Sequence, residues 1–164
     1  MPNWCNNEMT ISHEDPYMIQ RAADAWNRDE FLQELIPMPM EIQTNAASGQ
    51  MPDWWHWRIA NWGVKWDLGA GEYGDQAVVQ NNSFTVVYES PWSPPVEAYR
   101  KLVEMGFKIE AYYFECGIGF CGTFIDGEDT EYSIEGNSKW IRKNIPKKLD
   151  QMFGIASTYA EMHA

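Results

Sequence analysis

An alternation of strand and helix periods along the chain most constrains its fold. Within residues 3–12, Cys5, Met9 and Ile11 recur at a period of two, which predicts a strand with one apolar face. Residues 13–26 change to helical spacing, with Asp15 as the expected N-cap and Pro16 in the first turn. The apolar stripe predicted for this helix is Ile19, Ala22, Ala23 and Trp26.

The middle of the chain repeats this order. Residues 76–89 are predicted to form a hairpin that turns at Asn81 and Asn82, because asparagine tolerates a positive φ angle. A second helix is expected to follow, with Ser93 as its cap, Pro94 at its start and Gly106 at its end. Its predicted buried residues are Val96, Tyr99, Leu102 and Val103.

The last third of the chain predicts more sheet and then helix. Residues 107–126 are expected to form two strands joined near Gly117, and residues 128–134 a short edge strand. Residues 136–164 predict one or two short helices, broken at Pro146. This order fits an α+β protein with a βαββαβ core, in which an antiparallel sheet carries its helices on one face.

The charge of the chain is strongly uneven. Its 164 residues carry a net charge of −12. Residues 1–135 hold 22 acidic and 7 basic side chains, whereas residues 136–164 hold 2 acidic and 5 basic ones. Such a field repels nucleic acid and anionic membranes and favours basic partners. No apolar run approaches the length of a membrane span, and an odd set of three cysteines is typical of a reducing cytosol.

Five short stretches carry a resemblance to a known family. They are "MPNWCNN", "FLQELIPMPMEI", "WWHWRIANWGVKWD", "SPWSPP" and "FECGIGFCG", in this order between residues 1 and about 125. Together they resemble the YubB-type ferredoxin-like domain family of plasmids and bacteriophages. The resemblance implies a ferredoxin-like sheet with an insertion and a home in a mobile element, and it brings no catalytic residues. We expect one domain over 1–164, with a Trp-rich helical insertion at about 40–75 and a helical extension at about 136–164.

Residues 54–66 hold five of the nine tryptophans. A helix over 53–62 would place Trp55, Ile59 and Trp62 on a core-facing stripe, continued by Trp66, and would leave Trp54 and Trp57 available for binding. Arg58, Asn61 and Lys65 would lie on the flank of Trp54, so an aromatic and cationic binding patch is one interpretation. An internal cation–π stack of Arg58 on a tryptophan is the other.

Several possible sites can be weighed from spacing alone. "GIGFCG" at 117–122 matches a dinucleotide fingerprint, but strand and turn residues follow where a helix is needed. Cys5 or Cys121 with His56 is a candidate nucleophile–base pair, but nothing local supports it. A metal site of Cys5, Cys116, Cys121 and His56 is not favoured either, because these residues lack the close paired spacing of structural zinc ligands. The acidic run of Asp126, Glu128, Asp129 and Glu131 is either a solvated loop or part of a partner-binding face.

Direct nucleic-acid binding is not expected. Tyr112 and Phe114 are placed to stack bases on an outer sheet face, but the charge of residues 1–135 opposes it. The single basic cluster, "KWIRKNIPKK", is expected to pack against the acidic body.

The sequence therefore predicts a non-catalytic phage or plasmid accessory protein in the host cytosol, with no cofactor, metal or membrane contact. It would bind a host protein, for example a basic nucleic-acid-binding or defence protein, and inhibit or redirect it. The alternative is a small-ligand or nucleotide-binding module with a Trp-lined pocket. The predicted binding residues are Trp54, Trp57, Arg58, Lys65, Asp126, Glu128, Asp129 and Glu131.

Overall fold

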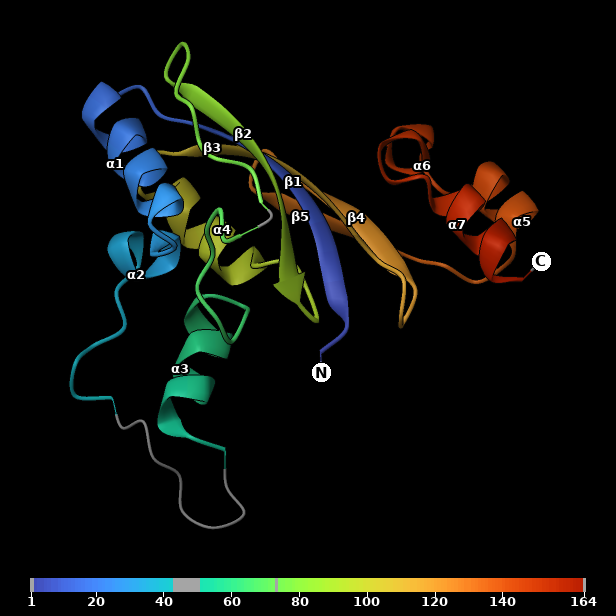
Figure 1. The fold of residues 1–164 in the computed structure, drawn as a ribbon, viewed down its shortest axis with the longest axis horizontal. Helices are drawn as coiled ribbons and strands as arrows, with labels where there is room; N and C mark the ends of the chain where they lie inside the picture. The colour runs from blue at the N-terminus through green and yellow to red at the C-terminus, as the bar shows by residue number, and fades with distance from the viewer. Residues whose placement is uncertain (1, 43–50, 73, 164) are drawn as a thin grey trace.

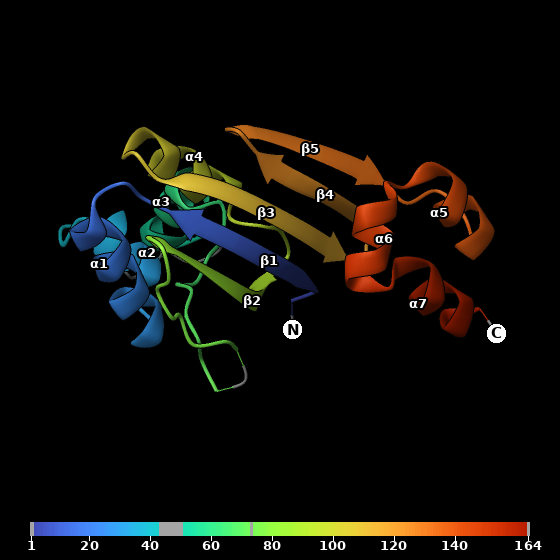
Figure 2. The same ribbon diagram turned by 90° about the horizontal axis from the view of Figure 1, so that it is seen from above.

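A computed structural model describes residues 2–42, 51–72 and 74–163. Its centre is an antiparallel five-stranded sheet in the order β2-β1-β3-β4-β5 (Figures 1 and 2). The strands are β1 (Trp4–Ser12), β2 (Ser83–Pro91), β3 (Lys108–Glu115), β4 (Phe120–Ile125) and β5 (Glu128–Ser133). The helices are α1 (Pro16–Asn27), α2 (Phe31–Leu35), α3 (Asp53–Asn61), α4 (Val96–Glu104), α5 (Ser138–Asn144), α6 (Lys147–Phe153) and α7 (Ile155–Met162).

The first strand and helix form as predicted. Cys5, Met9 and Ile11 are all buried on the helix-facing side of β1, which lies between β2 and β3. At the start of α1, a side-chain oxygen of Asp15 accepts a hydrogen bond from the Tyr17 amide at 2.9 Å. The predicted stripe is fully buried from Ile19 to Trp26. The positions of the strand, the helix cap and the buried stripe in this segment are therefore those predicted from the sequence.

The predicted hairpin forms only at its turn. Asn81 and Asn82 both have positive φ angles, of 54° and 58°. The segment before them, however, pairs with β2 through the single bridge between Gln80 and Ser83. One amide on this edge of β2, that of Val87, instead donates to the Asp75 carboxylate at 3.1 Å. The second strand of the βαββαβ order is thus reduced to an extended segment, and β4 and β5 lengthen the sheet at its other side.

Helix α4 begins later than predicted. The expected cap Ser93 donates instead to the Gly63 carbonyl at 3.2 Å, and the helix begins at Val96. The cause lies in the two consecutive prolines, because a residue before proline is pushed out of the helical region. Pro94 precedes Pro95 and so cannot start the helix. Gly106, with a φ angle of 95°, ends this segment as predicted.

The C-terminal helices pack at one end of the second face of the sheet. The break at Pro146 is confirmed, but Gly154, with a φ angle of 62°, makes a further break, so three helices form. They pack on the face opposite α1 and α4, where they bury Tyr112, Phe114 and Cys121 (Figure 2). The core has its helices on one face, as predicted, and the C-terminal extension covers one end of the other face. The buried residues of that layer are Ile141, Ile145, Leu149, Ile155 and Ala156.

The α+β ferredoxin-like class is therefore correct for the fold. The strands predicted on both sides of Gly117 and the edge strand after Asp126 are all present as β3, β4 and β5. Within the described ranges, no helix is long and apolar enough to cross a membrane. Part of the insertion predicted at about 40–75 lies outside the described residues, and the division into one domain with an insertion and an extension stays a prediction.

Candidate partner-binding groove

Helix α3 projects away from the sheet, and its tryptophans do not divide as predicted (Figure 1). None of its own residues is buried, and Ile59 is 36% exposed, so the core stripe is wrong. Trp62, just after the helix, is fully buried and donates from Nε1 to the Ile36 carbonyl at 2.9 Å. Trp57, expected to be available, packs edge-on against Trp62 and contacts the main core. The error arose because helical spacing shows which residues share a flank but not which flank meets the body.

Arg58 forms an internal cation–π stack. Its guanidinium lies between the rings of Trp54 and Trp62, with Cζ 5.0 Å and 4.9 Å from the two centroids. Its Nη1 donates to the Lys65 carbonyl at 3.0 Å, while burial lowers the pKa of Arg58. This geometry matches the structural interpretation of Arg58 and Trp54. Lys65 is different, because its Nζ lies 4.5 Å from the centroid of the exposed Trp66 ring.

The predicted acidic run is split by the pleat of the sheet. Asp126 lies in the β4–β5 turn with a φ angle of 53°. In β5, Asp129 and Glu131 pair with Phe124 and Gly122 and share their helix-facing side. Glu128 points to the opposite face, because side chains alternate along a strand. The fold therefore places two of these four carboxylates near α4 and separates the others from them.

Two adjoining hollows join these carboxylates to exposed aromatic residues. We call them together the Trp92 groove. The apolar hollow, of about 340 Å³, is lined by Met51, Trp55, Ile59, Gly63, Lys65, Pro91, Trp92 and Ser93. The acidic hollow, of about 210 Å³, is lined by Gly63, Ser93, Pro94, Val96, Glu97, Phe120, Asp129 and Glu131. Gly63 and Ser93 line both, so one bound segment would contact both hollows.

Trp92 is held in an unusual conformation at the rim of the groove. Its φ angle is 69°, a region that a bulky side chain rarely adopts, and its side chain is 45% exposed. The Trp92 amide donates to the Asn3 carbonyl at 2.8 Å, and Ser90 Oγ donates to the Ser93 carbonyl at 2.7 Å. Buried Asn7 in turn donates to Ser90 Oγ at 2.8 Å. The surrounding hydrogen bonds thus hold the backbone that carries this exposed indole.

The acidic end of the groove keeps a free carboxylate. Asp129 accepts a hydrogen bond from the Tyr113 hydroxyl at 2.7 Å, and burial raises the pKa of that hydroxyl, so it stays a donor. Glu97 pairs with Arg100 at 2.5 Å. Within the described ranges, Glu131 has neither an ion pair nor a hydrogen bond to its side chain. This end therefore has the capacity to bind a cation from another molecule.

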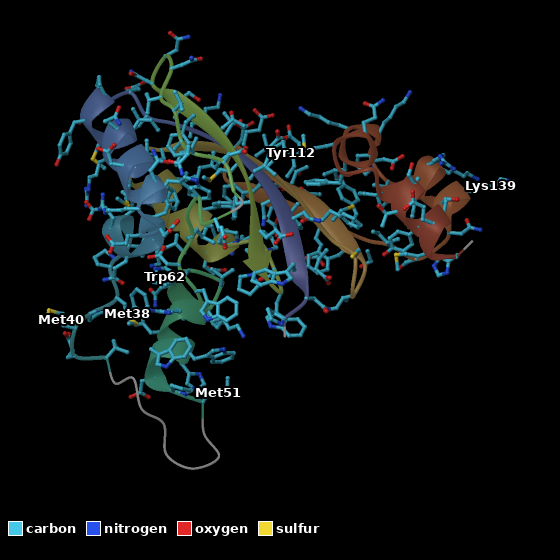
Figure 3. The ribbon with its side chains drawn as sticks, viewed as in Figure 1. Met38, Met40, Met51, Trp62, Tyr112 and Lys139 are labelled. Atoms are coloured by element: carbon cyan, nitrogen blue, oxygen red, sulfur yellow. The ribbon has the colours of Figure 1, made fainter. Side chains whose placement is uncertain are left out.

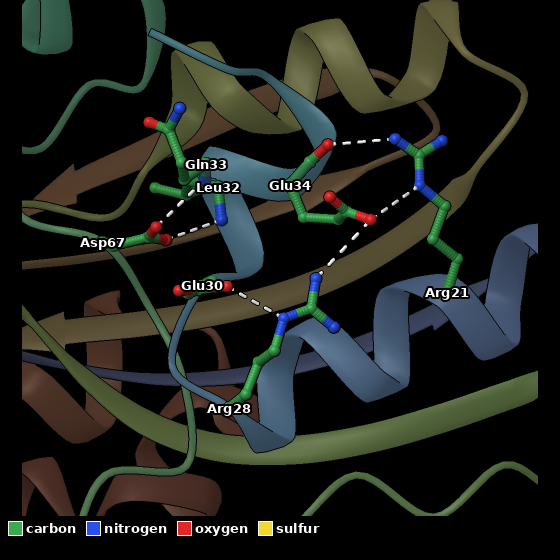
Figure 4. A network of polar contacts seen from close by, with 7 residues as sticks. All are labelled: Arg21, Arg28, Glu30, Leu32, Gln33, Glu34 and Asp67. Carbon is green, nitrogen blue, oxygen red and sulfur yellow. Dashed lines mark hydrogen bonds and ion pairs between the residues drawn. The ribbon is translucent and has the colours of Figure 1, made fainter.

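Basic side chains of the body are largely occupied elsewhere. Arg21 of α1 and Arg28, which follows its end, form ion pairs with Glu30 and Glu34 over N–O distances of 2.9–3.5 Å (Figure 4). Beside them, the Asp67 carboxylate accepts bonds from the first amides of α2, and burial raises the pKa of Asp67 (Figure 4). Because these arginines are paired, they do not offset the carboxylates of the groove locally.

The nucleophile candidates are not brought together. Cys5 points to the helix-facing side of the sheet and Cys121 to the other side, while His56 is exposed on α3. Burial raises the pKa of the Cys5 thiol and raises that of Cys121 to about 11, so both are protonated near neutral pH. Among the described residues, no cluster of three metal-ligating side chains occurs.

The two possible nucleotide contacts are also occupied. In the "GIGFCG" loop, the Glu115 carboxylate accepts the amide hydrogens of Gly117 and Ile118, the latter at 2.8 Å. Tyr112 and Phe114 do lie on the outer sheet face, but the C-terminal helices cover them. Lys148 packs there as predicted, with Nζ 2.8 Å from the Tyr112 hydroxyl. The other cations of this stretch are exposed, and Lys139 lies at the far end of the C-terminal helices (Figure 3).

Comparison with protein-family models identifies the family of this chain. The model of the family described as "Ferredoxin-like domain in Api92-like protein" matches residues 62–156, which is more than half of the chain. The chain belongs to this family. It is also similar to the crystal structure of the protein Api92 from Yersinia pseudotuberculosis, with 19% identity and a TM-score of 0.43. That match covers 65% of this chain and 40% of the Yersinia protein, and no curated protein matched.

Proposed function

We propose that this protein is a non-catalytic binding module that holds a basic segment of another protein in the Trp92 groove. The observation that carries the proposal is that two hollows adjoin. The exposed Trp92 lines one, and Glu131, which has no ion pair or hydrogen bond to its side chain among the described residues, lines the other. Tryptophan is a residue that dominates binding energies at protein interfaces. A carboxylate without a partner attracts cationic side chains and steers their approach.

The charge of the whole molecule supports a basic partner. Residues 1–135 carry a net charge of −15, and Arg21 and Arg28 are already paired with acidic residues. Such a field raises the rate of encounter with basic proteins and repels nucleic acid. Occupation of the partner's basic segment would then inhibit or redirect that partner. Of the predicted binding residues, Lys65, Asp129 and Glu131 line the groove, whereas Trp54 and Arg58 stack internally.

The finer parts of the proposal concern origin and setting. We propose a phage or plasmid accessory protein of the YubB type that acts on a host protein in the host cytosol. The support for this part is the resemblance of its five short sequence stretches and the odd set of cysteines. A basic nucleic-acid-binding or defence protein is the partner class that fits the charge.

A small-ligand function is the second candidate. It is favoured by the apolar hollow of about 340 Å³, which Trp55 and Trp92 line. This function predicts a change of tryptophan fluorescence with a metabolite or nucleotide. The change would be lost in Trp55→Ala or Trp92→Ala, rather than in variants of Trp54 or Trp57, which do not line the hollow.

Capture from host lysate at low salt tests the proposal. The immobilised full chain is expected to retain a basic protein that is released as the ionic strength rises, because screening weakens contacts between exposed charges. The Trp92→Ala column, run in parallel, should retain less of the same protein. Retention that is unchanged in high salt, or by Trp92→Ala, would contradict the proposal.

A further inference from the structure

The Trp92 groove has two ends of different chemistry, and this difference defines what fits it. We propose that it binds a two-part segment, in which an apolar side chain enters the apolar hollow and adjacent arginine or lysine side chains reach Asp129 and Glu131. This inference rests on the proposed function and specifies the partner segment. It requires both parts on one short stretch of chain, because the two hollows share Gly63 and Ser93.

The apolar hollow selects against a cation. Its walls include the exposed side chains of Met51, Ile59 and Trp92. A bound apolar group would remove water from these side chains, which lowers the free energy of binding. Lys65 lines the same hollow, and the Trp66 ring holds its ammonium group. A second positive charge placed there would be repelled by Lys65 and stripped of water. An aromatic or aliphatic side chain is therefore the better occupant.

The acidic hollow selects for a cation. Glu131 has no partner within the described ranges, and the Tyr113 hydroxyl uses only Oδ1 of Asp129. One oxygen of Asp129 and the whole carboxylate of Glu131 remain available. A guanidinium presents several donors in a planar fork, which suits two neighbouring carboxylates. Phosphate groups would be repelled, so a nucleic-acid strand does not fit.

The backbone between the two hollows is closely packed. Gly63 has a φ angle of 80°, and a Cβ atom at this position would stand 3.3 Å from the backbone nitrogens of Val96 and Glu97. This close approach leaves no room for a larger residue at position 63 between the end of α3 and the start of α4. Ser93 is tied to the same residue by its hydroxyl. A closely packed backbone here favours a defined spacing between the apolar and basic side chains.

Binding of capped hexapeptides to the full chain tests the inference. The two-part probe carries one phenylalanine next to two arginines. Three controls carry the arginines alone, the phenylalanine alone, or the phenylalanine with two glutamates. The dissociation constant is measured from the shift of the Trp92 indole signal in NMR spectra, which a Trp92→Phe variant identifies. We expect the two-part peptide to bind about tenfold more tightly than any control.

Two charge-reversed variants on one strand supply the matched control. Glu131→Lys should weaken the two-part peptide about tenfold, whereas Glu128→Lys, on the opposite face, should change it less than about twofold. Equal binding of the arginine-only and two-part peptides would overturn the inference but leave the proposed function standing. Equal effects of the two variants would also overturn it. If no peptide binds and lysate capture fails as well, the proposed function falls too.

Discussion

Trp92 is the residue where strain and exposure coincide. A bulky residue at positive φ costs roughly 1–2 kcal/mol relative to a helical or extended conformation. The fold accepts this cost at a side chain that is 45% exposed and contributes little to the core. The buried residues Asn7 and Ser90 hold the loop in place through hydrogen bonds. This combination supports the proposed role of the indole in binding.

Trp92→Gly separates binding from stability. Glycine relieves the positive φ angle, so the free energy of unfolding should change by less than about 1 kcal/mol. Partner capture should nevertheless fall. Trp62→Ala, which empties a fully buried site, should cost about 3–5 kcal/mol. Urea unfolding of both variants checks this. If Trp92→Gly destabilised the protein as much as Trp62→Ala does, Trp92 would be a structural residue.

Residue roles could be predicted only where local spacing decides them. The cap at Asp15 and the positive φ angles of Asn81 and Asn82 follow from local chemistry and were predictable. The burial of Trp57 against Trp62 depends on which flank of α3 meets α4, and helical spacing carries no such information. The positive φ angle of Trp92 was not predicted either. The only signal in the sequence was its place among the prolines of "SPWSPP".

At the scale of elements, the C-terminal helices form a layer with a small core of their own. Leu149 is fully buried there, and the contacts with the sheet run through Tyr112 and Phe114. Leu149→Ala should cost about 2–5 kcal/mol, felt mainly by this layer. Limited proteolysis should then cleave first near residues 134–137, while the segment from β1 to α4 stays protected.

Leu102→Ala in the main core is the control for this prediction. Leu102 is also fully buried, but it lies on α4 between the helices and the sheet. Its loss should expose cleavage sites throughout the protein. If Leu149→Ala also removed protection everywhere at once, the C-terminal helices would be a cooperative part of the core rather than a separable layer.

The spacing of apolar residues predicted most helices and strands. Two of the differences from the prediction occur at proline or glycine residues. The strand and helix periods gave β1, α1, β3, β4 and β5 in the right places. The start of α4 lies later than Pro94 because Pro95 pushes the residue before it out of the helical region. The break at Gly154 had a signal, since glycine in the left-handed region commonly ends a helix. The lost strand before Asn81 had none, because a side-chain contact from Asp75, rather than a backbone pairing, meets the Val87 amide of β2.

For the whole molecule, buried thiol and phenol groups predict sensitivity to alkali. Burial raises the pKa of Cys5, Tyr88, Tyr99 and Tyr113 above the ordinary values of 9.0 and 10.0. Above these values the unfolded chain loses protons that the folded protein retains, so folding stability falls as pH rises. Below pH 9 this contribution is fully present. Urea midpoints between about pH 7 and 10.5 should therefore decline from about pH 9.

A double variant assigns the first part of that decline. Cys5→Ala with Cys121→Ala removes the two buried thiols, whose ordinary pKa of 9.0 lies below that of tyrosine. The onset of the decline should move towards pH 10 in this variant. A midpoint that is flat from about pH 8 to 10 in the unmodified chain would contradict the burial of ionisable groups described above.

Charge organisation of the whole molecule underlies the central claim that the Trp92 groove binds a basic partner. The most direct measurement is the affinity for the captured partner as a function of salt, for the unmodified chain, Glu131→Lys and Glu128→Lys. We predict that the affinity falls steeply with salt, and that Glu131→Lys lowers it about tenfold while Glu128→Lys has a much smaller effect. An affinity independent of salt, or equal losses in the two variants, would contradict the account.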